Sequence, residues 1–582
     1  MPDRHRKTGE RKMRKQLIDL RRKMDERGID AYIVPTTDFH GSEYVNDYFK
    51  CREYISGFTG SAGTLVVTAE DAGLWTDGRY FLQASQELEG SGIRLMKMNH
   101  DGTPTIHEYL KENIPTGGTV GFDGRVVEYS TGRRLAEDYA IAYDLDLAGE
   151  IWTQRPKLRG SKIYALPAET TGETAESKLA RLRRAMAGKQ ADFHLITSLE
   201  EIAWLYNLRG NDVKYTPVFY AFALITMDED RLYVLDQSFE AKNAMPYLKI
   251  FDDLKSLGPG KILLDENVAS YSLVKSISSE TKIISGKDPA EIMKATKNPA
   301  EISCTKKAHI KDGIAMVRFL RWLKTSVGKE KITEISAADR LEALRRQQAG
   351  CFDLSFETIS GYMDNGAIVH YAPSPETDRQ IKPEGLLLVD SGGQYEEGTT
   401  DITRTIVLGP LTDEMKEDYT TVLKSNIDLA MTEFSRGTTG SMLDEIARKP
   451  LRERGMDFDH GTGHGVGHIL SVHEGPNNIS PRNGGWAITP GMITTDEPGV
   501  YKEGKYGIRL ENELLCVEKA NGDLGFEPIT MCPFDREAII PHMLTEEERK
   551  YLNEYHKKVR DILTPVLEQE AAEWLKEQTA PI

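Results

Sequence analysis

Three features that would place a chain in a membrane, in an oxidising compartment or on nucleic acid are scarce in this sequence. No stretch of its 582 residues approaches the roughly 20 consecutive apolar residues that cross a bilayer, so we expect no transmembrane segment. The five cysteines are scattered without CxxC spacing, which argues against a disulfide framework and a zinc ribbon. The 91 acidic residues outnumber 74 basic ones, and the formal charge of -17 disfavours binding to nucleic acid or an anionic membrane.

The N-terminal segment from Met1 to Arg22 is basic, but it has no apolar core of the roughly 7–15 residues that a secretory signal contains. We interpret it as a solvated arm that leads into a first helix. Together with the scattered cysteines, this segment predicts a cytoplasmic protein.

The length is far beyond that of one hydrophobic core and predicts two to four domains. An internal repeat supports this division, because six residues recur at a constant offset of 162. They are Leu17, Leu20, Arg21, Arg22, Met24 and Asp30, repeated as Leu179, Leu182, Arg183, Arg184, Met186 and Asp192. In each copy, residues at helical spacing precede a short apolar run, at 31–34 and at 193–197, and strand-like segments follow at 63–68 and 222–235. We therefore predict two similar α/β domains in tandem.

The domain boundaries follow from composition. Residues 152–174 collect proline, glycine, threonine and serine without periodicity, which is typical of a linker. The second copy is expected to end near Ser285, and a helix over 291–307 is expected to open the third region. We predict domains at 13–155, 160–290 and 291–582, with a C-terminal extension at 525–582 whose residues 545–576 form two helices.

Two aspartates lie at the ends of apolar strands in the third region. The run 386–390 ends in Asp390, and Asp401 precedes the apolar strand 402–408, so both lie at the mouth of one hairpin-like unit. Burying a carboxylate is costly unless it is hydrogen-bonded or binds a cation. The alternative is that both aspartates cap turns.

Four of the 13 histidines lie between residues 460 and 473, and glycines alternate with the first three, His460, His464 and His468. A zincin helix is disfavoured because each glycine opposes a helix by about 1 kcal/mol and no glutamate follows His460. A dinucleotide-binding loop lacks the following helix and acidic residue. Glycines around histidines indicate instead a close backbone approach to a ligand, in a tight loop or at a sheet edge.

Two glutamates, Glu497 and Glu511, follow or lie within strand-like segments, although either alone could be a solvated surface residue. With Asp390, Asp401 and His464 they supply about four negative charges, which would offset two divalent cations. Oxygen-dominated ligation with one imidazole suits harder metals such as Mn²⁺. Two such ions roughly 3.5–4 Å apart would hold a water between them, lower its pKa and polarise a carbonyl.

Several motifs together resemble the pita-bread metallopeptidases, and specifically the long, three-domain form of the Xaa-Pro aminopeptidase (aminopeptidase P) family. They lie at residues 367–373, 389–393, 400–405, 460–467, 472–476, 496–499 and 509–512. Residues 52–63 and 75–80 are similar to the first of the two creatinase-like N-terminal domains of that form, and 526–528 with the tail resemble its C-terminal extension. The resemblance covers almost the whole chain. It implies a homodimer that hydrolyses the bond between an N-terminal residue and a following proline.

The resemblance also implies roles for individual residues. The two metal ions would be held by Asp390, Asp401, His464, Glu497 and Glu511, with Asp401 and Glu511 bridging both ions. Glu497 would manage the proton of the attacking water, His473 would hydrogen-bond the developing oxyanion, and His370 would contact the proline side of the substrate. His460 and Arg509 would orient ligands or substrate. His468 departs from the family pattern, and we expect it to be a partly exposed structural histidine.

Three alternatives share part of this pattern. A prolidase has the same ligands but usually one N-terminal domain, and a methionine aminopeptidase typically has none. A pita-bread protein that binds peptides or proteins without metal, or a metal-free creatinase-like enzyme, is disfavoured by the complete set of five ligands.

Overall fold

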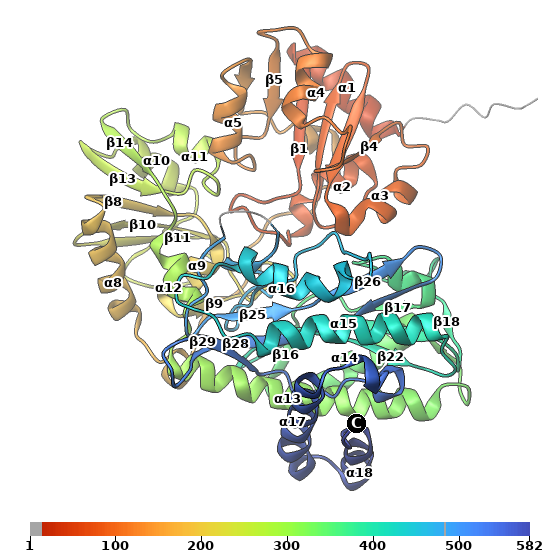
Figure 1. Cartoon of the computed structure of the whole chain (residues 1–582). Helices are drawn as coiled ribbons and strands as arrows, with labels where there is room; N and C mark the ends of the chain where they lie inside the picture. The colour runs from red at the N-terminus through yellow and green to blue at the C-terminus, as the bar shows by residue number, and fades with distance from the viewer. Residues whose placement is uncertain (1–13, 482–484) are drawn as a thin grey trace, which may run out of the picture. The chain divides into compact units, whose positions relative to one another are not determined.

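The computed structural model describes residues 14–481 and 485–582. The first 13 residues of the basic N-terminal arm lie outside the described residues, so our interpretation of that part stays a prediction. The chain forms two compact units (Figure 1). The first contains the described residues up to Ile163, Arg183–Ile202 and Phe219–Asp288, and the second contains Tyr164–Leu182, Ala203–Val218 and Pro289–Ile582.

The first unit begins with a six-stranded sheet in the order β4-β3-β2-β1-β5-β6. Its strands are β1 (Ala31–Pro35), β2 (Thr64–Thr68), β3 (Ala72–Thr76), β4 (Arg94–Lys97), β5 (Thr119–Phe122) and β6 (Ala140–Ala142). Helix α1 (Lys15–Arg27) precedes β1 and buries Leu17, Leu20 and Met24 on its apolar face. It ends at Gly28, whose φ of 65° is the left-handed conformation that glycine adopts readily.

A second sheet has the same topology, in the order β12-β11-β10-β8-β13-β14. Its strands are β8 (Phe193–Ile196), β10 (Ala221–Thr226), β11 (Asp230–Val234), β12 (Ala244–Pro246), β13 (Gly260–Leu264) and β14 (Thr281–Ser285). Each central strand pairs antiparallel with one neighbour and parallel with the other, as β1 does with β2 and β5, and β8 with β10 and β13. Helix α8 (Ala175–Gly188) precedes β8 as α1 precedes β1, so the predicted tandem repeat of α/β folds is confirmed.

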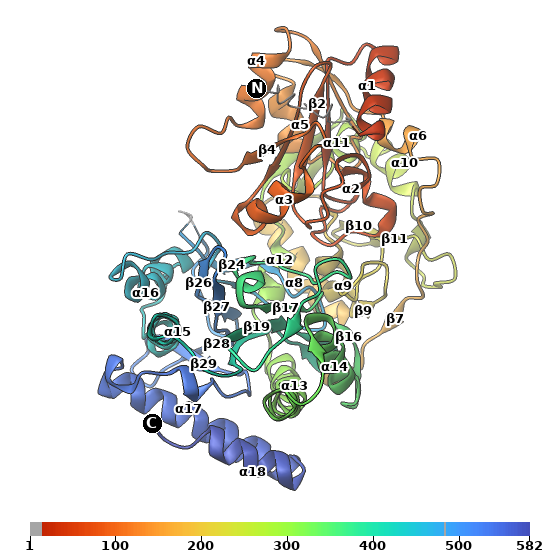
Figure 2. The same ribbon diagram turned by 90° about the vertical axis from the view of Figure 1, so that its right-hand side faces the viewer.

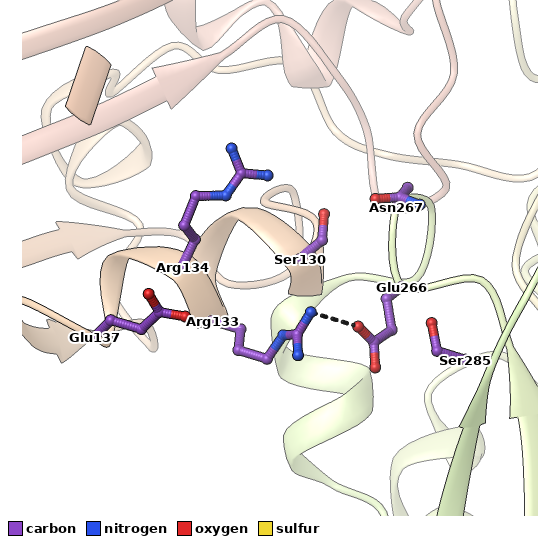
Figure 3. Close-up of a pocket in the computed structure, with 7 residues that line it drawn as sticks. All are labelled: Ser130, Arg133, Arg134, Glu137, Glu266, Asn267 and Ser285. Carbon is purple, nitrogen blue, oxygen red and sulfur yellow. Dashed lines mark ion pairs between the residues drawn. The ribbon is translucent and has the colours of Figure 1, made fainter. Parts of the chain in front are cut away.

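Equivalent loops of the two sheets pair with each other. The amide of Tyr129 donates to Ala269 O at 2.9 Å, and that of Tyr271 donates to Val127 O at 2.8 Å. These are the first residues of α5 (Tyr129–Leu135) and α11 (Tyr271–Lys275), which follow β5 and β13. Beside this joint lies a polar cavity of about 290 Å³, crossed by an ion pair between Arg133 and Glu266 at 3.1 Å (Figure 3).

The second unit contains two antiparallel sheets that carry the predicted ligands. One is β17 (Ile359–Tyr362), β19 (Leu386–Ser391) and β22 (Ile402–Val407), in the order β17-β19-β22. The other has the order β24-β23-β25-β28-β29, with strands β23 (Gly463–Gly465), β24 (Glu474–Ile479), β25 (Ile493–Asp496), β28 (Asn512–Glu518) and β29 (Leu524–Pro528).

Four helices flank these sheets: α13 (Pro299–Ser326), α14 (Glu334–Arg346), α15 (Asp413–Met431) and α16 (Gly440–Arg452). The long helices α13 and α15 run across the unit in Figure 1 and are seen nearly end-on in Figure 2. A large apolar cluster, which includes Tyr419, Val422 and Leu423 of α15 and Ile508 of β27 (Tyr506–Arg509), joins helices to sheets. Within residues 14–481 and 485–582, no helix has the length and apolar character needed to cross a membrane.

Two expectations about local structure need correction. The single helix expected over 291–307 is two helices, α12 (Pro289–Ala295) and α13, because Asn298 caps α13 and Pro299 occupies its first turn. The expected linker contains β7 (Tyr164–Ala165) and α7 (Ala168–Thr171), and Thr170 and Thr171 are buried. The predicted tail of two helices is confirmed as α17 (Glu546–Leu563) and α18 (Gln569–Gln578).

Candidate metal centre and active site

Strand register brings the predicted ligands to one end of the two sheets. β19 and β22 pair Asp390 with Thr403, which puts Asp401 at the same end of that hairpin. β25 and β28 pair Asp496 with Asn512, so Glu497 and Glu511 lie just beyond the same pair. The amide of Glu511 donates to Thr403 O at 3.1 Å and joins the two sheets.

The donor atoms converge as a cation requires. Ligand atoms of Asp401, His464 and Glu511 all lie within 4.8 Å of one another. His464 Nε2 lies 3.4 Å from Asp401 Oδ2 and 3.6 Å from Glu497 Oε1. Its Nδ1 is 3.0 Å from Gly465 O, a carbonyl that only accepts, so Nδ1 carries the proton and Nε2 presents a lone pair to the carboxylates. This tautomer is the one that binds metal through Nε2.

The clustering of buried carboxylates in the site also favours the binding of cations. The pKa of Asp401 is raised well above its ordinary value by burial and by the neighbouring carboxylates Asp390 and Glu497. Burial, Asp401 and Asp390 raise the pKa of Glu511 in the same way. Asp390 Oδ1 is buried and accepts no hydrogen bond from the described residues. Carboxylates this close stay ionised at neutral pH when divalent ions neutralise them, so the residues present fit a dinuclear metal site.

The glycines near His464 serve strand packing. A Cβ on Gly463 would lie 1.8 Å from Thr495 O, and one on Gly392 would lie 1.9 Å from Thr400 O. The predicted close backbone approach is present, and His464 lies on a sheet strand; the group that a Cβ on Gly463 would meet belongs to the neighbouring strand.

A partly buried hydrogen-bonded chain links two of the predicted active-site residues to the predicted ligand Asp390. Arg509 Nη2 donates to Asp390 Oδ2 at 2.7 Å, and Arg509 Nη1 donates to the hydroxyl of Tyr501 at 2.8 Å. His460 Nδ1 faces Gly461 O at 2.7 Å and therefore carries the proton, so Tyr501 donates to His460 Nε2, also at 2.7 Å. Sequence reasoning missed Tyr501, whose phenol has its pKa raised by burial.

Of the remaining predicted histidines, His473 lies beside the predicted ligand His464, and His370 lies next to a residue that contacts Arg509. The ring of His473 meets that of His464 edge-on, with centroids 4.3 Å apart and an angle of 88° between planes. His370 is half-buried and directly follows Val369, whose carbonyl accepts from Arg509 Nη2 at 3.2 Å. The structure therefore gathers all of the predicted site residues in the second unit.

His468 was predicted to be partly exposed, and this is wrong. Its side chain is only 3% exposed, and burial lowers its pKa to about 3, so the ring is neutral. Nε2 donates to Thr170 O at 3.2 Å, and Nδ1 accepts from the hydroxyl of Thr305 at 3.0 Å. These partners lie far away in sequence, which is why the spacing of the histidines did not reveal them.

Two further buried groups support the ligands and were missed. Glu513 Oε1 accepts from the amide of Asp401 at 2.8 Å, and its other oxygen lies 3.1 Å from His309 Nε2. Arg404 Nη2 donates to Asn512 Oδ1 at 2.9 Å and to Cys532 O at 2.7 Å, so it ties β22 and β28 to the C-terminal region. For Glu513, the one sequence signal was its position two residues after Glu511, at the start of β28.

Glu474, next to His473, lies between two buried lysines. Its carboxylate is 2.7 Å from Lys294 Nζ and 2.9 Å from Lys297 Nζ, and the lysines lower its pKa to about 2 despite burial. Replacing Glu474 by glutamine removes the charge that both lysines face, and should lower the free energy of unfolding by about 3–5 kcal/mol. A folded-state pKa below the ordinary 4.5 means that this stabilisation is present above 4.5 and is lost as the pH falls toward 2.

A matched control exists at Glu527, which also faces two lysines, Lys306 at 2.8 Å and Lys558 at 3.2 Å, but is 35% exposed. Water screens this cluster, so Glu527→Gln should cost about 1 kcal/mol or less. Urea unfolding of both variants measures the difference. Equal losses would show that the buried cluster near His473 contributes nothing special to stability.

Sequence models of known families match the chain in four consecutive segments. A creatinase/prolidase N-terminal domain matches residues 17–156 and a second one matches 154–301. Metallopeptidase family M24 matches residues 303–518, and the C-terminal region of peptidase M24 matches 522–582. The fold and the site thus define a metal-dependent peptidase of the M24 class with two creatinase-type N-terminal domains.

Full-length relatives narrow this class. A probable Xaa-Pro aminopeptidase P of Fusarium vanettenii is 39% identical, over 97% of this chain and 98% of the relative, and aminopeptidase P1 of Arabidopsis thaliana is 37% identical over 95% and 97%. The crystal structure of X-prolyl aminopeptidase from Caenorhabditis elegans, described as a cytosolic enzyme with a di-nuclear active site, has a TM-score of 0.93 and 33% identity and covers 97% of this chain and 99% of its own. The chain therefore belongs to the Xaa-Pro aminopeptidase (aminopeptidase P) family, and the prediction of a metallo-aminopeptidase is confirmed.

The prolidase alternative covers much less of the molecule. The crystal structure of a recombinant prolidase from Thermococcus sibiricus is 25% identical and covers 63% of this chain, with a TM-score of 0.52. That enzyme is matched over 99% of its own length and still leaves more than a third of this chain uncovered.

Proposed function

We propose that this protein is a dinuclear, manganese-dependent aminopeptidase that removes the N-terminal residue from peptides with proline at the second position. The observation that carries the proposal is the convergence of Asp401, His464 and Glu511, with Glu497 and Asp390 beside them, in a chain that matches X-prolyl aminopeptidase over nearly its full length. Bound divalent ions would supply a Lewis acid and lower the pKa of the attacking water.

The chain's own residues then divide the work. Asp390, Asp401, His464, Glu497 and Glu511 would hold the two ions. Glu497 accepts a proton from the attacking water and passes it to the leaving amine. His473 donates a hydrogen bond to the oxyanion that develops on the first carbonyl, and His370 contacts the proline side of the substrate.

The chain of Arg509, Tyr501 and His460 keeps Asp390 in position. Arg509 is 1% exposed and uses separate nitrogens for Asp390 and Tyr501, so a single rotamer satisfies both. Such outer partners orient a ligand carboxylate and typically contribute about 10–100-fold to metal affinity or activity.

There is a physical reason for an enzyme that is adapted to proline. Proline has no amide N–H and a fixed φ, so a site that binds ordinary extended peptides binds a proline peptide poorly.

An assay with two substrates tests the proposal. Purified protein with Mn²⁺ should cleave an Arg-Pro-Pro tripeptide after its first residue, and elemental analysis should find bound metal. The comparison substrate is a Gly-Pro dipeptide. Turnover of the dipeptide alone would indicate a prolidase, and the absence of turnover with any divalent ion would indicate a binding protein.

We further propose a cytoplasmic homodimer whose partners are peptides, without binding to nucleic acid or membrane, and whose domains span 13–155, 160–290 and 291–582. Membership of the family supports the dimer, and the C. elegans relative is described as cytosolic. Sedimentation equilibrium at the mass of one 65.3 kDa chain would contradict the dimer.

A further inference from the structure

Residues 466–472, called here the histidine loop, connect the ligand His464 to His473. The loop closes on itself, since the amide of Gly467 donates to Ser471 O at 2.9 Å. Its three central carbonyls accept hydrogen bonds from buried side chains outside the loop. Gln394 Nε2 donates to Leu470 O at 2.7 Å, and the other two carbonyls face a single arginine, Arg209.

Arg209 spans the loop with both sides of its guanidinium. Nε donates to Ile469 O at 2.5 Å and Nη2 donates to His468 O at 3.0 Å, while Nη1 donates to Ala203 O at 2.8 Å. The side chain is 2% exposed, and burial lowers its pKa to about 10, so the group remains charged at neutral pH. Burying a charge is unfavourable, and the carboxylates Glu301 and Glu474 partly offset it.

The loop backbone needs this support. Ile469 has φ of 54°, a left-handed conformation that is strained for a β-branched residue and persists only where surrounding contacts impose it. The contacts of Arg209 to His468 O and Ile469 O flank the strained residue. The side chain of His468 is held on its other side by Thr170 and Thr305, so the first half of the loop is enclosed.

In the sequence, Arg209 lies within the second creatinase-type domain, whose family model matches residues 154–301. Its segment Ala203–Val218 nevertheless belongs to the compact unit that holds the metal ligands. The second N-terminal domain therefore contributes a segment that packs as part of the catalytic unit.

We propose that Arg209 is a positioning residue, which fixes the histidine loop and thereby sets His473 against His464 for catalysis. This inference rests on the role of His473 given under the proposed function. A planar guanidinium can hold two successive carbonyls and a third on its far side, which the single ammonium of lysine cannot do with the same geometry. Arg209 acts on the position of His473 and leaves the five metal ligands in place.

Arg209→Met removes the donors and nearly keeps the length of the side chain. With an Xaa-Pro tripeptide and Mn²⁺, it should lower kcat by about 10–100-fold, the scale of a small misplacement of a catalytic group, and change KM little. Bound metal should stay at the wild-type level, and hydrogen exchange should rise in 466–473. Arg183→Met is the matched control, because Arg183 also donates to a backbone carbonyl in the second repeat, Thr226 O at 3.0 Å, and should leave kcat unchanged.

A double-mutant cycle with His473→Ala separates positioning from general stability. If Arg209 acts through His473, adding Arg209→Met to His473→Ala lowers kcat no further, and Arg209→Lys restores kcat only in part. The inference would be overturned if the kcat losses of the two single variants multiplied in the double variant. It would also be overturned if a folded Arg209→Met protein had the wild-type kcat. Full activity of His473→Ala would overturn the role of His473 itself, and an inactive wild type would overturn the proposed function. If Arg209→Met does not fold, Arg209→Lys carries the same cycle.

Discussion

Replacing Glu511 by glutamine is expected to lower kcat on an Xaa-Pro tripeptide by at least about 10³-fold, since a metal ion contributes several kcal/mol to catalysis and each 1.36 kcal/mol is about tenfold. Glu511 is 1% exposed, and its Oε2 accepts from the hydroxyl of Thr403 at 2.7 Å, so the amide would keep the shape and lose the charge. Bound metal should fall below the wild-type content in elemental analysis.

The control for Glu511→Gln lies on the same strand. Glu518, at the far end of β28, is 54% exposed and pairs with Arg436 at 2.7 Å. Glu518→Gln changes the same functional group outside the site, and should alter kcat by less than about twofold because an exposed ion pair contributes little. Wild-type turnover and metal content in Glu511→Gln would remove Glu511 from the site.

The candidate ligands could be predicted from the sequence because strand ends are local features. Asp390 closes one apolar run and Asp401 opens the next, and an antiparallel hairpin necessarily brings such ends together. Glu497 and Glu511 stand at the ends of two strands that also pair. The tandem repeat was equally visible, because helix and strand periodicities recur at one offset.

Side chains that act across the fold could not be predicted in this way. Tyr501 reaches His460 across 41 residues, and Arg209 reaches Ile469 across 260. Their partners are backbone atoms or single nitrogens, which leave no pattern of residue types in the sequence. His468 was misjudged for the same reason, because burial was decided by segments around Thr170 and Thr305.

One error did have a local signal. The break between α12 and α13 lies at Asn298 and Pro299, and Glu301 completes a capping box with Asn298. An Asn cap, a proline in the first turn and a glutamate three residues after the cap together mark a helix start. The prediction of one helix over 291–307 did not use this signal, because helix-forming residues on both sides of it suggested a single continuous helix.

Removal of the metal ions by a chelator is expected to abolish turnover and to make stability depend on pH. In the metal-free protein, burial and mutual repulsion raise the pKa values of Asp401 and Glu511. A carboxyl group whose pKa is raised in the folded state stabilises the protein at a pH below its ordinary pKa. This stabilisation is lost as the pH rises through the raised pKa. From about pH 5 to about pH 8, the melting temperature of the metal-free protein should therefore fall.

We expect Mn²⁺ to reverse this trend, because the proposed site would bind it through ionised carboxylates. Each site should add about 2.7 kcal/mol to the free energy of unfolding when free Mn²⁺ is 100 times its Kd, and metal binding competes with protons, so the gain grows with pH. Thermal melts with and without Mn²⁺ across this range measure the difference, and restored turnover should follow restored stability. If Mn²⁺ changed the melting temperature by the same amount at every pH, the buried carboxylates would not be the groups that hold the ions.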